Sequence, residues 1–207
     1  MPSFSERVAL FRIQQYLAKY RPYVVAVVGT YGRTIAAQAL YHAISHHRHA
    51  RIGFGMEQEN NIRELTEIEP DTIVSTIPLE YPGHASYLMS RMLPRLLVIS
   101  HIGLEHIDLV GSKDMLAHEY LAVANTLATD AVVVLNADDE HVRELQEHIN
   151  HPVIMYGMHP SADVHLVRAK RGEEQGIFME FVLHGVHYEA HVPHIISKQH
   201  VAAVLAG

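Results

Sequence analysis

A glycine-containing loop between an apolar run and a helical stretch is the segment of this sequence best suited to chemistry. Residues 23–28 lead into Gly29-Thr30-Tyr31-Gly32-Arg33-Thr34. Glycines let backbone N–H groups approach phosphate oxygens, a helix N-terminus adds positive potential, a basic side chain neutralises charge, and a Thr hydroxyl can hold Mg²⁺. The longer pattern G-x-x-x-x-G-K-[ST] is not met, because Val27 stands at its first glycine and Arg33 at its lysine. On spacing alone, an ordinary glycine turn explains this loop as well as a phosphate site does.

Short β-rich runs alternate with helical stretches around this loop, a pattern typical of a mainly parallel sheet with helices on its faces. We therefore expect an α/β protein with a three-layer fold of the P-loop type. Apolar and β-branched runs predict strands at 23–28, 72–76, 95–100, 131–135 and 153–156. Helices are predicted at 33–47, 84–91, 112–128 and 138–149. Ser112 followed by Asp114 is a typical helix start.

The two ends of the chain differ from this alternating region. Residues 1–20 predict an amphipathic helix that places Phe4, Val8, Phe11 and Tyr16 on one side. Residues 163–191 alternate apolar and polar side chains around turn signals, which predicts an antiparallel meander at the sheet edge. Residues 197–207 predict a short helix. We expect a domain over residues 21–207 preceded by the helix of residues 1–20.

Composition excludes several classes of protein. The 207 residues, 48% of them hydrophobic, can bury a core, so the chain is not intrinsically disordered. Its 23 acidic and 16 basic side chains argue against nucleic-acid binding, which depends on Lys and Arg. Without cysteine there is no disulfide framework and no thiolate site, which is compatible with the cytoplasm. No apolar run approaches the ~20 residues that span a bilayer.

A second segment gives the glycine loop a more specific meaning. Residues 96–145 closely resemble the central ATP-binding domain of the Mur ligases and of the related folylpolyglutamate and cyanophycin synthetases. The family's loop is the shorter G-T-x-G-K-T, so Val27 fits it. Upstream, residues 78–84 are similar to the family's E-x-x-x-x-P-G segment, although they are two residues shorter. The landmarks that follow in the family's order are Ile102-Gly103-Leu104-Glu105-His106, Gly111-Ser112 and Leu135-Asn136-Ala137-Asp138-Asp139.

The resemblance, which covers about residues 21–207, implies a role for each matching position. Asn136 and Asp139 match positions that contact the adenine and ribose; the alternative for this segment is a helix N-cap with acidic first-turn residues. Arg33 and His106 would carry the catalysis. Mg²⁺ would be held by Thr34, Glu80 and His106. The phosphates of ATP would be bound by Gly29, Thr30, Gly32, Arg33 and Thr34.

Four positions depart from the family pattern. Arg33 replaces the loop lysine, and its planar fork does not place charge as a lysine does. Tyr31 replaces a small or amide residue, and His101 stands where Asn commonly precedes Ile-Gly. Tyr120 falls where the family has a lysine that becomes carbamylated and helps bind a second metal.

The family joins a carboxylate to an amine: ATP phosphorylates the carboxylate, and the amine attacks the acyl phosphate. The resemblance implies ATP and Mg²⁺ as cofactors, and a UDP-sugar-peptide or other carboxylate with an amino acid as substrates, in cytoplasmic peptidoglycan-precursor synthesis. The family's N-terminal and C-terminal domains are expected to be absent from residues 1–207. Two alternatives stay open: a nucleotide-binding pseudoenzyme, and a His-rich metal-binding or scaffold protein.

The 18 histidines are the basis of the last alternative. Tetrahedral zinc needs convergent ligands, but groups at helix ends and along strands do not share one face consistently. Most of these side chains are expected on the solvated surface. The groups are His46, His47 and His49; His148 and His151; and His184, His187, His191 and His194.

Overall fold

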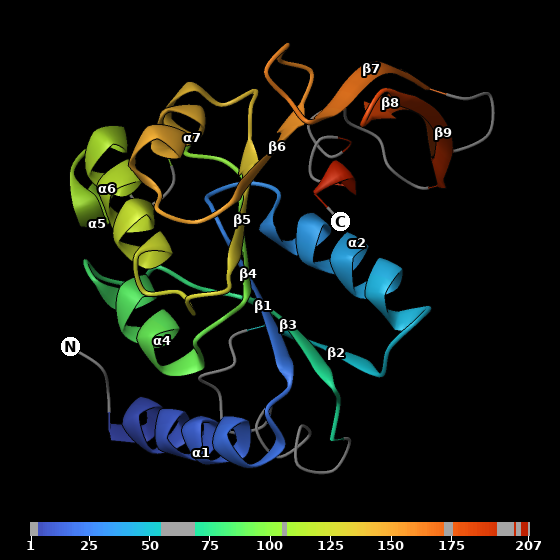
Figure 1. The fold of residues 1–207 in the computed structure, drawn as a ribbon. Helices are drawn as coiled ribbons and strands as arrows, with labels where there is room; N and C mark the ends of the chain where they lie inside the picture. Colours follow the sequence, from blue (N-terminus) through green and yellow to red (C-terminus); the bar gives the residue numbers. More distant parts are fainter. Residues whose placement is uncertain are drawn as a thin grey trace.

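The structure is a computed structural model that describes residues 4–54, 69–104, 107–171, 176–193, 201 and 204–206. One nine-stranded sheet crosses it, with strand order β2-β3-β1-β4-β5-β6-β7-β8-β9 (Figure 1). Its strands are β1 (Tyr23–Val28), β2 (Ala50–Phe54), β3 (Thr72–Thr76), β4 (Leu96–Ile99), β5 (Val132–Asn136), β6 (Val153–Gly157), β7 (Val164–Arg171), β8 (Gly176–Leu183) and β9 (Val186–Pro193).

Neighbouring strands from β2 to β7 pair in parallel, and the β7–β8 and β8–β9 pairs are antiparallel. The predicted meander at the sheet edge is therefore confirmed. The helices are α1 (Phe4–Tyr20), α2 (Arg33–Ser45), α4 (His84–Met92), α5 (Ile107–Val110), α6 (Lys113–Ala124) and α7 (Glu140–Glu144), with a 3₁₀ turn η1 at Leu145–His148.

The sheet separates two apolar layers, because successive strand side chains point to opposite faces. On β1, Val24, Ala26 and Val28 pack with α1, α4, α6 and α7, whereas Val25 and Val27 pack with α2. Figure 1 shows α2 on one side of the sheet and the other long helices on the opposite side. The predicted three-layer α/β fold is confirmed.

The predicted apolar side of the N-terminal helix is wrong for Phe4 and Phe11, whereas Tyr16 is buried as predicted. Phe4 and Phe11 are 76% and 59% exposed, and Ala9, Leu10, Ile13 and Tyr16 form the buried side. Both sets recur at helical spacing, but only the second faces α4, against which α1 packs. No helix among the described residues is long and apolar enough to cross a bilayer.

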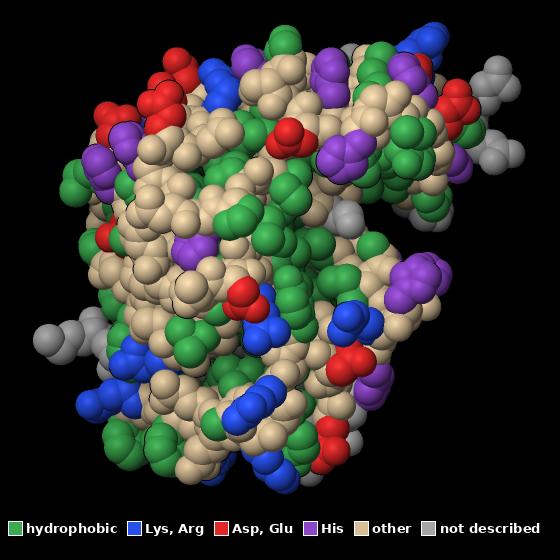
Figure 2. All heavy atoms as spheres, in the orientation of Figure 1, with side chains coloured by type: hydrophobic (Ala, Val, Ile, Leu, Met, Phe, Trp, Pro, Cys, Tyr) green, Lys and Arg blue, Asp and Glu red, His purple; other side chains and the backbone are tan. Residues whose placement is uncertain are grey.

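Charge is unevenly distributed over this fold. Figure 2 shows Lys and Arg side chains around α1 and acidic side chains around α7, at opposite ends of the molecule. The formal net charge of −7 therefore does not describe the end of the molecule that carries α1.

Candidate functional site

Gly29 occupies a position where no side chain fits. It follows β1 with φ +133°, a conformation that residues with a Cβ rarely adopt. A Cβ atom there would lie 2.1 Å from Ser100 Oγ and 2.9 Å from the backbone nitrogen of His101. The glycine thus allows the loop after β1 to approach the segment that follows the adjacent strand β4.

Hydrogen bonds fasten the glycine loop to that segment. Ser100 Oγ donates to the carbonyl of Tyr31 at 2.7 Å. The N–H of Thr30 donates to the carbonyl of His101 at 2.8 Å, and Thr30 Oγ1 accepts from the N–H of Gly103 at 2.7 Å. Thr30 is 8% exposed, so its hydroxyl holds the loop in shape, and its direct contact with phosphate stays a prediction.

The N-terminus of α2 opens directly from this loop. Its N-cap is Gly32, which has φ +81° and no side chain to accept a hydrogen bond, and the first turn contains no acidic residue. Such a terminus leaves backbone N–H groups and positive potential for an anion. Thr34, in the same turn, is exposed, so its hydroxyl can reach a ligand bound there.

Arg33 connects the loop to the neighbouring strand β3. Its Nη1 donates to the carbonyl of Ile77 at 3.1 Å, just beyond the end of β3. A guanidinium has five N–H donors, so this bond leaves others for a phosphate. Glu80 lies three residues beyond Ile77 and is exposed.

Two of the three predicted magnesium ligands lie beyond the ends of adjacent strands, Thr34 in the first turn of α2 and Glu80 in the loop before α4. Thr34 follows β1, Glu80 follows β3, and these strands pair in parallel, so both residues follow carboxyl ends of the sheet. A hydroxyl and a carboxylate are hard oxygen donors of the kind that Mg²⁺ prefers, so the residues fit the ion. The third, His106, lies outside the described residues, and its role stays a prediction.

Asn136 and Asp139 lie at the carboxyl end of β5, and protein groups already engage both. Asn136 donates to the carbonyl of Ser100 at 2.7 Å. Asp139 is the N-cap of α7: its Oδ1 accepts from Val142 N–H at 3.1 Å, and its Oδ2 accepts from Ile102 N–H at 2.8 Å and contacts His101 Nδ1.

The carboxylate of Asp139 is stabilised in its charged form. Burial opposes ionisation, but the hydrogen bonds from His101, Ile102 and Val142 outweigh that effect and hold the pKa of Asp139 below its usual range. Its side chain is only 4% exposed. The N-cap interpretation is thereby confirmed, and the contact with ribose stays a prediction.

Sequence reasoning missed several residues that hold the site together. Ser100 bonds to residues 69 and 72 positions away, and such pairing has no signature in local spacing. His84 and Glu119 bond to the loop around Glu80 from α4 and α6. At position 120, where the family has a lysine, the structure places a core residue: the side chain of Tyr120 on α6 is 1% exposed and packs in the apolar core.

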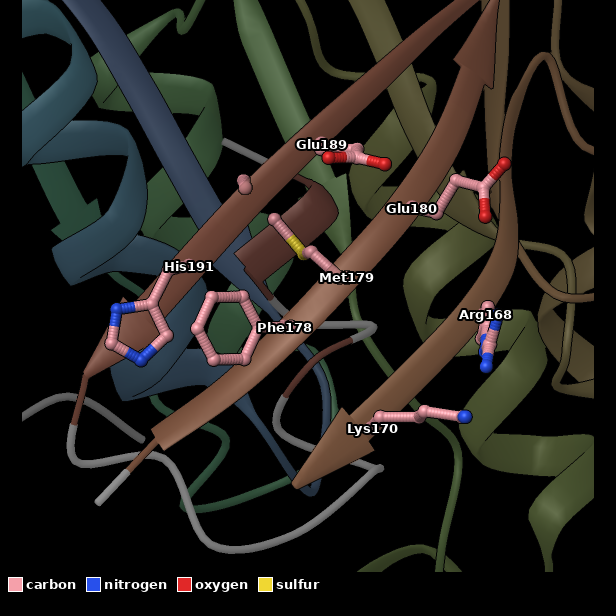
Figure 3. Close-up of a pocket in the computed structure, with 8 residues that line it drawn as sticks. Arg168, Lys170, Phe178, Met179, Glu180, Glu189 and His191 are labelled. Atoms are coloured by element: carbon pink, nitrogen blue, oxygen red, sulfur yellow. The ribbon is translucent and has the colours of Figure 1, made fainter. Parts of the chain in front are cut away.

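The histidines do not gather into a metal centre within the described part of the chain, where no group of three or more His, Asp or Glu residues could hold an ion. Figure 2 shows them scattered over the face in view. A recess on the β7–β9 meander is lined by His191, which stacks on Phe178 at 4.3 Å, and by Arg168, Lys170, Glu180 and Glu189 (Figure 3). His194 lies outside the described residues.

Comparison with known proteins identifies the fold. The family model of the Mur ligase middle domain matches residues 27–206. This chain belongs to the Mur ligase family. Among solved structures, this Mur ligase domain is similar to the MurF ligase from Thermotoga maritima in complex with ADP, with a TM-score of 0.84 at 16% identity over 100% of this chain and 48% of that one. The structure of MurF from Acinetobacter baumannii is similar with a TM-score of 0.83 at 17% identity, over 98% of this chain and 44% of that one.

Curated Mur ligases match over part of their length. UDP-N-acetylmuramate--L-alanine ligase from Borreliella burgdorferi is 21% identical over 145 residues, which are 69% of this chain and 30% of that protein. The enzyme of the same name from Syntrophus aciditrophicus is 31% identical over 112 residues, 49% of this chain and 23% of that protein. The chain therefore spans less than a third of these relatives.

Proposed function

We propose that this Mur ligase domain binds ATP with Mg²⁺ at the carboxyl edge of its sheet and promotes ATP-dependent ligation of a carboxylate to an amine. The observation that carries the proposal is the uncapped N-terminus of α2, opening from a glycine loop with Arg33 beside it. The ligases to which the chain is similar include one whose solved structure contains ADP. The proposed reaction takes place in the cytoplasm, with a peptidoglycan precursor or other carboxylate and an amino acid as substrates.

The residues of the chain act mainly by positioning and charge neutralisation, as phosphoryl transfer requires. Backbone N–H groups of the loop and of the first turn of α2 hold the phosphates. The guanidinium of Arg33, fixed at one corner by Ile77, directs its remaining donors toward the same charge. Thr34, Glu80 and His106 would hold Mg²⁺, which would neutralise the phosphates when bound. Asn136 would contact the adenine, and the segment around Asp139 would shape the rim of that pocket.

A second function, nucleotide binding without ligation, is favoured by two observations. Tyr120 is buried in the core where the family resemblance places a lysine that becomes carbamylated, so that position supplies no carbamate ligand for a second metal. Arg33, held to the carbonyl of Ile77, stands where the family loop has a lysine, and its fork does not place charge as a lysine does. Phosphate release from MgATP, measured with candidate carboxylates and amino acids, separates the two functions. Release that requires both substrates supports ligation, and nucleotide binding without release under any such pairing supports the second function.

Arg33→Lys tests the proposed phosphate site. A lysine would present a point charge and would not be held to Ile77, so we expect MgATP to bind more tightly in calorimetry. Arg91→Lys is the matched control, because Arg91 also donates to a backbone carbonyl, that of Tyr87 at 2.8 Å, but from α4. Unchanged affinity in Arg33→Lys, or an equal change in both variants, would contradict the assignment.

A further inference from the structure

His84 is a fully buried polar side chain next to the loop that carries Glu80. It is the first residue of α4, its side chain is 0% exposed, and its Nδ1 accepts a hydrogen bond from the backbone N–H of Glu80 at 3.2 Å. A ring nitrogen that accepts from an N–H cannot itself carry a proton, so the proton of His84 is on Nε2. That nitrogen donates to Oε1 of Glu6 at 2.8 Å.

Glu6 links α1 to this loop through His84. It lies in the first turn of α1, 78 positions before His84, and its side chain is 13% exposed. The ring of Tyr81 stacks on His84 with centroids 4.4 Å apart and planes 20° apart, which fixes the plane of the imidazole. The link therefore runs from a carboxylate on α1, through one oriented ring, to the backbone of Glu80.

The other end of the same loop is held from α6. The N–H of Gly83 donates to both carboxylate oxygens of Glu119, at 3.0 Å each. Gly83 has φ +81° and a Cβ there would meet nothing within 4 Å, so the glycine serves the turn. Residues 80–83 are thus held by His84 of α4, which bonds to Glu6 of α1, and by Glu119 of α6, although Glu80 itself is exposed.

We propose that Glu6 and His84 are positioning residues that set the Glu80 loop for metal binding. This inference rests on the proposed role of Glu80 as a Mg²⁺ ligand. Hydrogen bonds from groups behind a ligand orient that ligand, and their loss typically weakens metal affinity about 10- to 100-fold. Helix α1 lies outside residues 27–206, which match the family model, so this chain builds part of its metal site from an element that the family model does not include.

The test uses Mn²⁺ as a spectroscopic probe in place of Mg²⁺. Electron paramagnetic resonance measures the affinity of the full chain for Mn²⁺ in the presence of ADP, and calorimetry measures ADP affinity in chelator. Glu6→Ala should weaken Mn²⁺ binding about 10-fold and leave metal-free ADP binding unchanged. Glu6→Gln keeps an oxygen that accepts from Nε2 and should remain near the wild type. Amide exchange of Glu80, followed without metal, should accelerate in Glu6→Ala.

Leu10→Ala is the matched control for damage to α1. Leu10 is 1% exposed in the core on the same helix, and it is not part of the link to Glu80. Equal Mn²⁺ affinities in Glu6→Ala and wild type, or equal losses in Glu6→Ala and Leu10→Ala, would overturn the positioning role alone. A wild-type chain that binds ADP but no Mn²⁺ beside it would overturn the metal role of Glu80 and this inference together.

Discussion

Asp139→Ala is predicted to destabilise the fold strongly, because this carboxylate joins two segments of the carboxyl edge. The change removes the N-cap of α7, which is worth about 1 kcal/mol. The cap bond is the one from the N–H of Val142, and the change also leaves the buried N–H group of Ile102 without its acceptor, at about 1–3 kcal/mol. The expected total is a loss of about 2–4 kcal/mol in the free energy of unfolding.

Urea denaturation measures this loss. With a slope of about 1–3 kcal/mol/M, a loss of about 3 kcal/mol lowers the midpoint by roughly 1–3 M. Glu140→Ala is the matched control, since Glu140 is an exposed acidic residue in the first turn of the same helix. Its loss should stay below about 1 kcal/mol.

The result that would refute this reasoning is equal stability of the two variants. If Asp139→Ala kept its stability but lost ADP affinity, the carboxylate would be a ribose ligand as the family resemblance implies. A large loss of stability is the outcome expected of a buried cap.

Three further predictions concern pH, the loop glycine and α1. Because the pKa of Asp139 is lowered in the fold, its stabilisation should be full above about pH 4, the unfolded range, and should be lost as pH falls through the lower folded pKa. The stability difference between wild type and Asp139→Asn should therefore shrink in acid, and a constant difference down to pH 2 would disagree. Gly29→Ala should lower the free energy of unfolding by about 2–6 kcal/mol, through backbone strain and the collision of the new Cβ with its neighbours. Gly185→Ala is the control and should cost about 1–3 kcal/mol, because its φ is +78° but its Cβ would meet nothing within 4 Å. Equal shifts of the melting temperature in the two variants would exclude the collision. Leu10→Ala should lower the free energy of unfolding by about 2–5 kcal/mol, and Phe11→Ala should change it by no more than about 0.5 kcal/mol. A larger loss in Phe11→Ala, measured by urea denaturation, would show that Phe11 lies on the buried side of α1.

Local patterns in the sequence predict much of this fold. The strands 23–28 and 72–76 have the predicted bounds, because buried β-branched runs end at clear turn residues. Ser112 caps α6 as predicted, with its side chain accepting from Met115 N–H at 3.1 Å. By contrast, β2 was not predicted, since Arg51 and Gly53 interrupt its short apolar run.

What the sequence could not predict depends on tertiary neighbours. Two sets of apolar residues recur at helical spacing on α1, so the sequence alone does not determine which set is buried. Packing against α4 buries Leu10 and leaves Phe11 exposed. The predicted helix 138–149 divides into α7 and a 3₁₀ turn at Leu145. At the site, the glycine motif is local and is recognised from the sequence, but the bonds that hold it join residues 44 to 73 positions apart.

The central claim is that the loop from Gly29 to Thr34 and the first turn of α2 bind the phosphates of a nucleotide. The most direct measurement is the change in backbone amide chemical shifts when MgADP is added to the ¹⁵N-labelled chain. The account predicts the largest shifts at Gly29, Gly32, Arg33 and Thr34, with smaller ones at Asn136. Binding without shifts in the loop, or with the largest shifts on the β7–β9 meander, would contradict it.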